Sequence, residues 1–238
     1  MSFSNDGGTC QALRRAVLSL DLLPGERLSE RGLEGLLGAS RTPIRAALMR
    51  LENEGLIRRA GRGWQVAPID LTEIRALMEY REALETAAVA LAAQRAEAAE
   101  LSALRALAQA DASHDDEQAG LRDGEDFHVA LARLSRNPFL AEAISGALTR
   151  LSRTRWLEVR TPRSRAQTRA EHLDMVAALA ARNIPLAQER AAMHIRSTCD
   201  RLLGYLSEEH RRLRGRGLAI VKSDAVPPSA KAAMRRFE

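Results

Sequence analysis

Three histidines in the second half of the chain carry the side chain best suited to bind a transition metal. His128, His172 and His194 lie in three separate segments of helix-forming sequence, so only the tertiary fold can bring them together. Imidazole nitrogen suits Zn, Ni, Fe or Mn, usually with a carboxylate or a water completing the shell. The residues alone leave two interpretations open, a shared metal site or three unrelated histidines in the core or at the surface.

Arginines nearer the N-terminus form a second group of candidate functional residues. Residues 41–62 hold six arginines and only two acidic residues, which gives a local charge of +4. Arg41 and Arg45 are four residues apart and therefore share one side of a helix. Arginine best matches the N7 and O6 atoms of guanine, and the hydroxyls of Ser40 and Thr42 suit phosphate oxygens at a helix start. The cluster favours DNA binding over the alternative, a solvated arginine face.

The elements that hold this cluster are predicted to be three short helices and a hairpin. Apolar residues at helical spacing indicate helices over residues 11–20, 29–38 and 40–54. A turn at Gly61-Arg62-Gly63 between two apolar stretches predicts a β-hairpin. Three helices followed by a hairpin are typical of a winged helix-turn-helix, whose third helix enters the major groove of DNA. Residues 1–70 are therefore predicted to form a winged helix-turn-helix DNA-binding domain.

The sequence that follows has helical periodicity almost without a break. Six helices are predicted, at 72–94, 97–111, 117–135, 138–160, 165–182 and 185–207. Prolines at 138 and 185 mark restarts, because proline fits the first turn of a helix. The fold class is therefore mainly α, with an all-α antiparallel helical bundle over residues 71–207 after the winged helix-turn-helix.

The last segment of the chain has a different composition. Residues 208–238 carry eight basic and four acidic residues together with proline, serine and alanine. Such sequence is typical of a solvated segment without a packed core. We predict that it is a basic, disordered tail rather than a dedicated DNA-binding arm.

The overall composition excludes several classes of protein. The 238 residues include 36 Lys+Arg and 31 Asp+Glu, and 45% are hydrophobic, as in ordinary globular proteins. No apolar run is long enough to span a membrane, and the N-terminus lacks the layout of a secretory signal. Two cysteines are too few for a disulfide framework or a thiolate zinc site. We expect a cytoplasmic protein with no membrane partner.

The segment LLPGERLSERGLEGLLGASRTPIRAALMRLENEGLIRRAGRGWQV resembles the N-terminal domain of the GntR family of bacterial transcription regulators. PGERLSE, LGASRTPIRAALMRLENEGLI and the Gly-Arg-Gly wing carry the resemblance, which extends over residues 13–68. The resemblance implies a set of DNA-contacting residues: Arg31, Arg41, Thr42, Arg45 and the wing glycine, Gly63. Ala46 departs from the acidic residue that is common in the family, a change that concerns helix packing more than base recognition.

Three further segments, YREALETAAVALAAQRA, DFHVALARLSRNPFL and EHLDMVAALAARNIPLAQERAAMHI, resemble the FCD effector domain of one GntR branch. The resemblance extends over residues 72–207, and six helices suggest the VanR-like rather than the FadR-like subgroup. In metal-binding members one Asp and three His converge in the bundle. The resemblance places His128, His172 and His194 on the three histidine positions.

The fourth ligand position departs from the family pattern. The motif D-x-x-F-H would put an Asp four residues before His128, where Gly124 stands. A residue three or four positions earlier shares a helix face with His128, so Glu125 is the best substitute and Asp123 the next. The resemblance thus implies a divalent ion, Zn, Ni or Mn, with one of these carboxylates as its oxygen ligand.

Arg81, in YREALE, matches an arginine that often faces the effector pocket of this domain. Beside a metal it would bind the carboxylate of an effector in bidentate fashion. An ion pair between Arg81 and Glu85 on a solvated helix face is the alternative.

Taken together, these features predict a transcription regulator and not an enzyme. We expect a homodimer whose winged domains bind a pseudo-palindromic operator in double-stranded DNA, while each bundle binds a small organic acid that shifts DNA affinity. Release of DNA by the effector, and hence repression in its absence, is the commoner behaviour in the family. The alternative is a metal-dependent hydrolase with an appended DNA-binding module, although no general base lies at motif spacing near the histidines.

Overall fold

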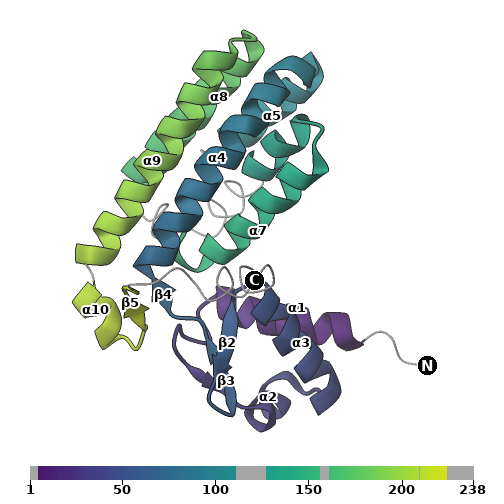
Figure 1. Cartoon of the computed structure of the whole chain (residues 1–238), viewed down its shortest axis with the longest axis vertical. Coiled ribbons are helices and arrows are strands. Elements are labelled where there is room, and N and C mark those ends of the chain that lie inside the picture. The colour runs from purple at the N-terminus through teal and green to yellow at the C-terminus, as the bar shows by residue number, and fades with distance from the viewer. Residues whose placement is uncertain (1–4, 111–126, 156–160, 209, 224–238) are drawn as a thin grey trace, which may run out of the picture. The chain divides into compact units, whose positions relative to one another are not determined.

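A computed structural model describes residues 5–110, 127–155, 161–208 and 210–223 (Figure 1). The chain divides into two compact units, which are described separately below. Unit 1 consists of residues 1–73 together with 208–238, and unit 2 of residues 74–207. Among the described residues, no helix has both the length and the apolar character that crossing a bilayer requires.

Three helices of unit 1 surround a common apolar core: α1 (Asn5–Leu18), α2 (Glu30–Leu37) and α3 (Arg41–Asn53). The Ser29 side chain caps α2 by accepting a hydrogen bond from the Gly32 backbone N–H, and Gly38 ends the helix with a φ of 61°. These are the local signals that favour a helix start and stop. The predictions for α2 and α3 are confirmed, whereas α1 begins before the predicted residue 11 and ends at Leu18.

The predicted hairpin is confirmed and belongs to a three-stranded sheet. Its strands, β2 (Ile57–Ala60) and β3 (Gly63–Val66), pair antiparallel, and β1 (Arg27–Leu28) adds to the other edge of β3. Gly61 has a φ of 61°, a conformation that glycine adopts without strain. The guanidinium of Arg59 lies 3.5 Å above the ring of Trp64, which is buried. The wing is thereby anchored to the core of unit 1.

The C-terminal segment differs from its predicted disorder over residues 210–223. It forms α10 (His210–Gly215) and β5 (Ile220–Val221), and β5 pairs in parallel with β4 (Ile69–Asp70). The Ile69 N–H donates to the Ala219 carbonyl at 2.9 Å, and Thr72 Oγ1 donates to the Ser223 carbonyl at 2.6 Å. Three apolar side chains within this basic stretch, Leu213, Leu218 and Ile220, are buried in the structure. Residues 224–238 of the predicted tail lie outside the described residues.

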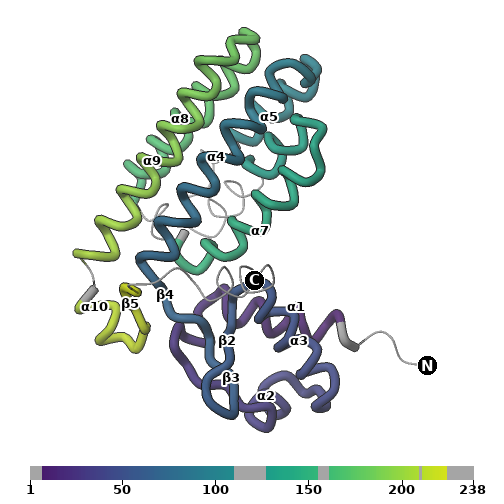
Figure 2. The backbone as a smooth tube through the Cα atoms, in the orientation of Figure 1, coloured from purple at the N-terminus to yellow at the C-terminus, as the bar shows by residue number. Residues whose placement is uncertain are grey.

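Unit 2 is a helical bundle, as predicted (Figure 2). Its helices are α4 (Leu71–Arg95), α5 (Ala98–Ala110), α7 (Pro138–Arg155), α8 (Pro162–Ala180) and α9 (Ile184–Glu208). Residues 127–134 are also helical and represent the described part of the segment predicted at 117–135. Side chains from all six helical segments contribute to one apolar core, in which alanines allow close helix packing.

The helix ends of unit 2 follow from local sequence and from one contact across the bundle. Thr161 and Ser164 form a capping box at the start of α8. At the other end of the bundle, the Arg182 guanidinium donates to the carbonyls of Ala93 and Ala96, at 2.8 and 2.6 Å. These carbonyls belong to the last turn of α4 and the residue that follows it, so the contact satisfies acceptors that a helix end leaves open.

We predict that Ile220→Ala lowers the free energy of unfolding of unit 1 by ~2–4 kcal/mol, because it removes a buried side chain and leaves a cavity. Urea unfolding and hydrogen exchange at the Ile69 amide would measure the effect. Val221→Ala is the matched control, since Val221 is the next residue along β5 and is 39% exposed. Equal destabilisation by both variants would contradict the packing of β5 on unit 1.

Candidate functional site

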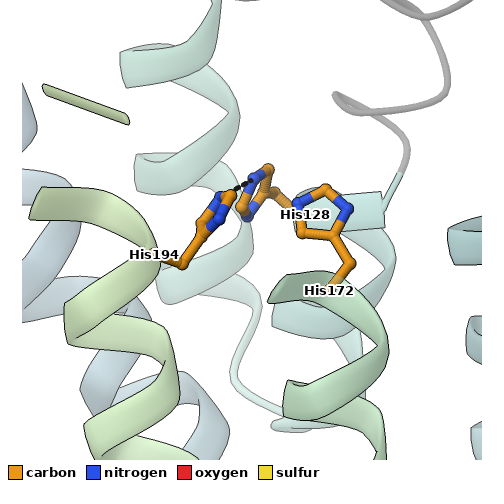
Figure 3. A group of neighbouring side chains, drawn as sticks. All are labelled: His128, His172 and His194. Atoms are coloured by element: carbon orange, nitrogen blue, oxygen red, sulfur yellow. Dashed lines mark hydrogen bonds between the residues drawn. The ribbon is translucent and has the colours of Figure 1, made fainter. Parts of the chain in front are cut away.

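The three predicted histidines converge inside unit 2 (Figure 3). His128 comes from the helical stretch 127–134, His172 from α8 and His194 from α9, and all three are buried. One potential ligand nitrogen from each ring lies within 4.8 Å of the other two. The tertiary fold therefore makes a single cluster from residues 66 positions apart in sequence at most.

Two of the histidines are oriented by carboxylates on other helices. The distance from His128 Nδ1 to Glu85 Oε2 is 2.7 Å, and that from His194 Nδ1 to Glu171 Oε2 is also 2.7 Å. An ionised carboxylate only accepts hydrogen bonds, so each Nδ1 must be the protonated nitrogen. The Nε2 atoms of His128 and His194 then present lone pairs, and they lie 3.3 Å apart.

This spacing matches what a bound metal ion requires. Two imidazole nitrogens on one tetrahedral zinc ion, each at about 2.1 Å, are separated by about 3.4 Å. Two lone pairs facing each other in a buried site repel unless a cation lies between them. Metal-binding histidines commonly donate their other N–H to a carboxylate, as both of these rings do. The donor set of the described residues therefore fits a divalent metal.

The charge state of Glu85 depends on Arg81. Burial by itself raises the pKa of Glu85, but the positive charge of Arg81 and the hydrogen bond from His128 outweigh it and hold the pKa well below its usual range. The Arg81 Nη2 atom lies 2.8 Å from Glu85 Oε1. Burial also lowers the pKa of His128 to about 3, against the opposing effect of Glu85. His128 is thus neutral, which is the form that binds a metal.

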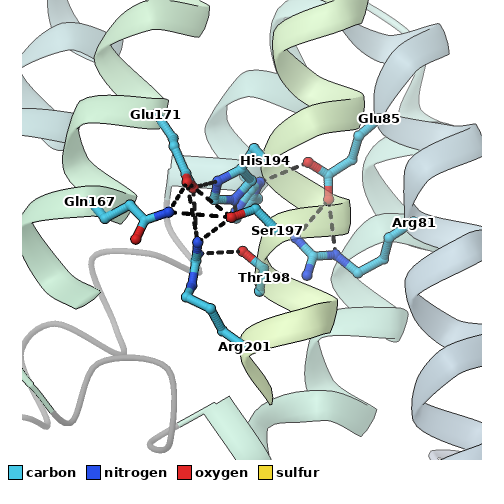
Figure 4. Close-up of polar contacts among 9 residues, drawn as sticks. Arg81, Glu85, Gln167, Glu171, His194, Ser197, Thr198 and Arg201 are labelled. Carbon is cyan, nitrogen blue, oxygen red and sulfur yellow. Dashed lines mark hydrogen bonds and ion pairs between the residues drawn. The ribbon is translucent and has the colours of Figure 1, made fainter. Parts of the chain in front are cut away.

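Glu171 is held by a second network, on α8 and α9 (Figure 4). Arg201 Nη1 donates to Glu171 Oε1 at 3.1 Å, and Arg201 Nη2 donates to Thr198 Oγ1 at 3.0 Å. Gln167 Nε2 donates to the same Glu171 oxygen at 2.9 Å. Burial tends to raise the pKa of Glu171, but the hydrogen bonds from His194 and Arg201 lower it to about 2.

The third histidine is positioned by an aromatic contact. The ring of His172 stacks on that of Phe127, with centroids 4.0 Å apart and an angle of 10° between the planes. Phe127 immediately precedes His128 in sequence and is itself fully buried. The dipeptide Phe127-His128 thus contributes one ring to the cluster and supports another.

The remaining site predictions for unit 2 have different outcomes. Asp123 and Glu125 lie outside the described residues, so the fourth ligand stays a prediction. Arg81 pairs with Glu85, and the pair is buried rather than on a solvated face. The role of Arg81 in effector binding also stays a prediction.

Glu85, Glu171 and Arg201 were missed as site residues by the sequence reasoning. Two sequence features could have indicated them. Glu85 lies four residues after Arg81, a spacing that allows an ion pair on one helix face, and Glu171 directly precedes His172.

The predicted DNA-contacting residues occupy exposed positions in unit 1, except for Gly63, which is partly buried. Arg41, Thr42 and Arg45 are exposed on α3, and the opposite face of that helix is buried in the core. Ser40 stands at the N-cap of α3 without a side-chain capping bond, and Arg31 is exposed on α2. A Cβ at the position of wing residue Gly63 would lie 3.3 Å from the Leu28 carbonyl oxygen, so a larger residue there would crowd β1.

Comparison with known families assigns both units. Residues 8–66 match the bacterial regulatory proteins of the gntR family, and residues 76–197 match the FCD domain. The Nta operon transcriptional regulator of Aminobacter aminovorans is 33% identical over 190 residues, which cover 79% of this chain and 89% of that protein. The HTH-type transcriptional regulator LutR of Bacillus subtilis (strain 168) is 27% identical over 211 residues, covering 79% of this chain and 96% of LutR.

Solved structures share the fold. A putative GntR transcriptional regulator from Rhodococcus sp. RHA1 superposes with a TM-score of 0.71 at 22% identity, covering 84% of this chain and 98% of that one. E. coli McbR/YncC gives a TM-score of 0.68 at 22% identity and covers 86% and 99% of the two chains. The two family matches and the similarity to the Nta regulator agree with the elements described above. The chain therefore belongs to the GntR family of bacterial regulatory proteins, in the branch with an FCD domain, and is a DNA-binding transcription regulator rather than an enzyme.

Proposed function

We propose that the protein is a homodimeric repressor in the bacterial cytoplasm that releases operator DNA when its FCD domain binds a small organic acid. The observation that carries the sensing role is the buried histidine cluster, with His128 and His194 oriented so that their Nε2 atoms converge. His128, His172 and His194 hold one divalent ion, Zn, Ni or Mn, in this proposal. A bound ion would supply a fixed positive charge for the carboxylate of the effector.

Charged residues around the three histidines orient their rings and keep the net charge of the buried site low. Glu85 and Glu171 balance the charge of the ion and hold the ring tautomers, while Arg81 and Arg201 hold the two carboxylates. An effector that competes for either arginine would change the packing of α4 or α9. Arg81 remains the proposed carboxylate-binding residue of the site.

Two chain connections would transmit such a change to the DNA-binding unit. The Glu85-bearing helix, α4, directly follows β4, and the His194-bearing helix, α9, is followed by α10 and β5. Because β4 and β5 are hydrogen-bonded to each other in unit 1, displacement of α4 against α9 acts on that strand pair. The effector acts only to the extent that it binds the two arrangements with different affinity.

The first prediction here concerns the metal. Protein purified without chelator and dialysed against Zn, Ni or Mn should hold one ion per subunit, measured by elemental analysis. His128→Ala and His194→Ala should lose it with the helices still formed, as judged by circular dichroism, because the bundle has its own core. Metal-free wild-type protein after this loading would contradict the proposal.

A second prediction distinguishes the carboxylate that orients His128 from the carboxylate that binds the metal directly. Glu85→Gln should weaken metal affinity by about 10–100-fold, since it removes the charge that orients His128. Glu79→Gln, on an exposed position of the same helix, is the control and should leave affinity unchanged. Glu125→Gln and Asp123→Asn, measured separately, assign the fourth ligand, and an unchanged metal content in both variants would leave a three-histidine site.

The third prediction concerns base recognition. Arg45→Ala should weaken binding to a duplex that the wild-type protein selects from a randomised library by ~1–3 kcal/mol and relax the preference at one base pair per half-site. Thr42→Ala should weaken binding to all sequences more evenly, because a phosphate contact carries little base information. Fluorescence anisotropy at fixed salt measures both. Unchanged affinity of Arg45→Ala would show that α3 does not read the bases.

A further inference from the structure

Two acidic residues of α2 pair with two arginines of α3. Glu30 and Glu34 are one helical turn apart, as are Arg41 and Arg45. Arg45 Nε donates to Glu30 Oε1 at 2.7 Å, and Arg41 Nε donates to Glu34 Oε1 at 3.1 Å. The two pairs lie next to each other between the helices. The first acid of α2 pairs with the second arginine of α3, and the second acid pairs with the first arginine.

The pairs leave the outer part of each guanidinium available. The side chains of Arg41 and Arg45 are both 69% exposed, whereas those of Glu30 and Glu34 are only 25% and 32% exposed. Both hydrogen bonds to the carboxylates use Nε. A guanidinium has five N–H groups, so the four on the terminal amino groups can still reach a DNA base.

These ion pairs contribute little to folding stability, but they strongly reduce the net positive charge on the surface around Arg41 and Arg45. An exposed pair stabilises a protein only slightly, because both groups are well solvated when apart. Non-specific DNA binding, in contrast, depends on the number of phosphates that Lys and Arg neutralise. A carboxylate beside each arginine opposes a phosphate contact at that position. It opposes a bidentate contact with the N7 and O6 atoms of guanine much less, because these acceptors carry only partial negative charge.

We infer that Glu30 and Glu34 are specificity-determining residues, which hold Arg45 and Arg41 for base contacts and weaken their attraction to the phosphates of non-cognate DNA. This inference rests on the proposed role of the two arginines in base recognition. The acids act through the arginines and are positioning residues that need not touch DNA. A purely structural role in joining α2 to α3 would change stability and leave sequence discrimination intact.

The test compares two duplexes, one selected by the wild-type protein from a randomised library and one with the same composition in scrambled order. The double variant Glu30→Gln, Glu34→Gln keeps an oxygen acceptor for each Nε and removes both charges. Its affinity for the scrambled duplex should rise about 3–10-fold, with a log–log salt dependence steeper by about 1–2. The selected duplex should gain less, so the ratio of the two affinities should fall.

Asp21→Asn is the charge control, because Asp21 is exposed in the same unit, lies outside α2 and α3, and its substitution removes one negative charge, half the change in the double variant. It should leave the ratio unchanged. The double variant to alanine removes the acceptors as well and should also weaken binding to the selected duplex. Urea unfolding midpoints of all variants should stay close to that of the wild type.

An unchanged affinity ratio in the double glutamine variant would overturn the inference, as would the same loss of discrimination in Asp21→Asn. These results are distinguishable from failure of the proposed function. If the wild-type protein selects no sequence, or if Arg45→Ala binds the selected duplex as tightly as wild type, the base-contacting role itself is wrong and the inference fails with it.

Discussion

The hydrogen bonds from two buried histidines to two carboxylates tie together four helical segments of the FCD domain. They link α4 to the helical stretch 127–134 through Glu85 and His128, and α8 to α9 through Glu171 and His194. A buried polar group without a partner costs free energy, so these contacts constrain how the helices can pack. They also set which ring nitrogen carries the proton. The two remaining nitrogens consequently face each other at 3.3 Å, a spacing that suits a shared cation.

This arrangement places charge deep in a small bundle, where Arg81 pairs with Glu85 and Arg201 pairs with Glu171. Arg81 and Glu85 are both about 1% exposed, and the hydrogen bonds that Glu85 accepts from Arg81 Nε and His128 Nδ1 offset part of the cost of burying its charge. Arg81 donates a hydrogen bond to Glu85, and Glu85 accepts one from His128 and thereby orients its ring. The core of the bundle consists largely of alanine and leucine, and the small alanine side chains let the helices approach each other closely.

In the DNA-binding unit the ion pairs lie at the surface rather than in the core. There the arginines of α3 are exposed and their acidic partners on α2 are less so, and both ion pairs lie outside the apolar core. The unit also includes the C-terminal segment, whose strand β5 pairs with β4 directly before the first helix of the bundle. The chain thus passes between the units twice, and both passages end in one pair of hydrogen-bonded strands.

Local signals in the sequence were sufficient to predict most helices and the hairpin, whereas the three histidine positions came from the resemblance to the FCD domain. Ser29, Gly38 and Gly61 act on their immediate neighbours, and apolar periodicity within one helix identifies its buried face, so both can be read without knowing the fold. Only the tertiary structure paired Glu85 with His128, 43 residues away, buried the Arg81–Glu85 pair and turned residues 220–221 into a strand. Periodicity states which side of an element faces inward, but which side chain it meets there depends on how separate elements cross, and that is decided by the packing of the whole core.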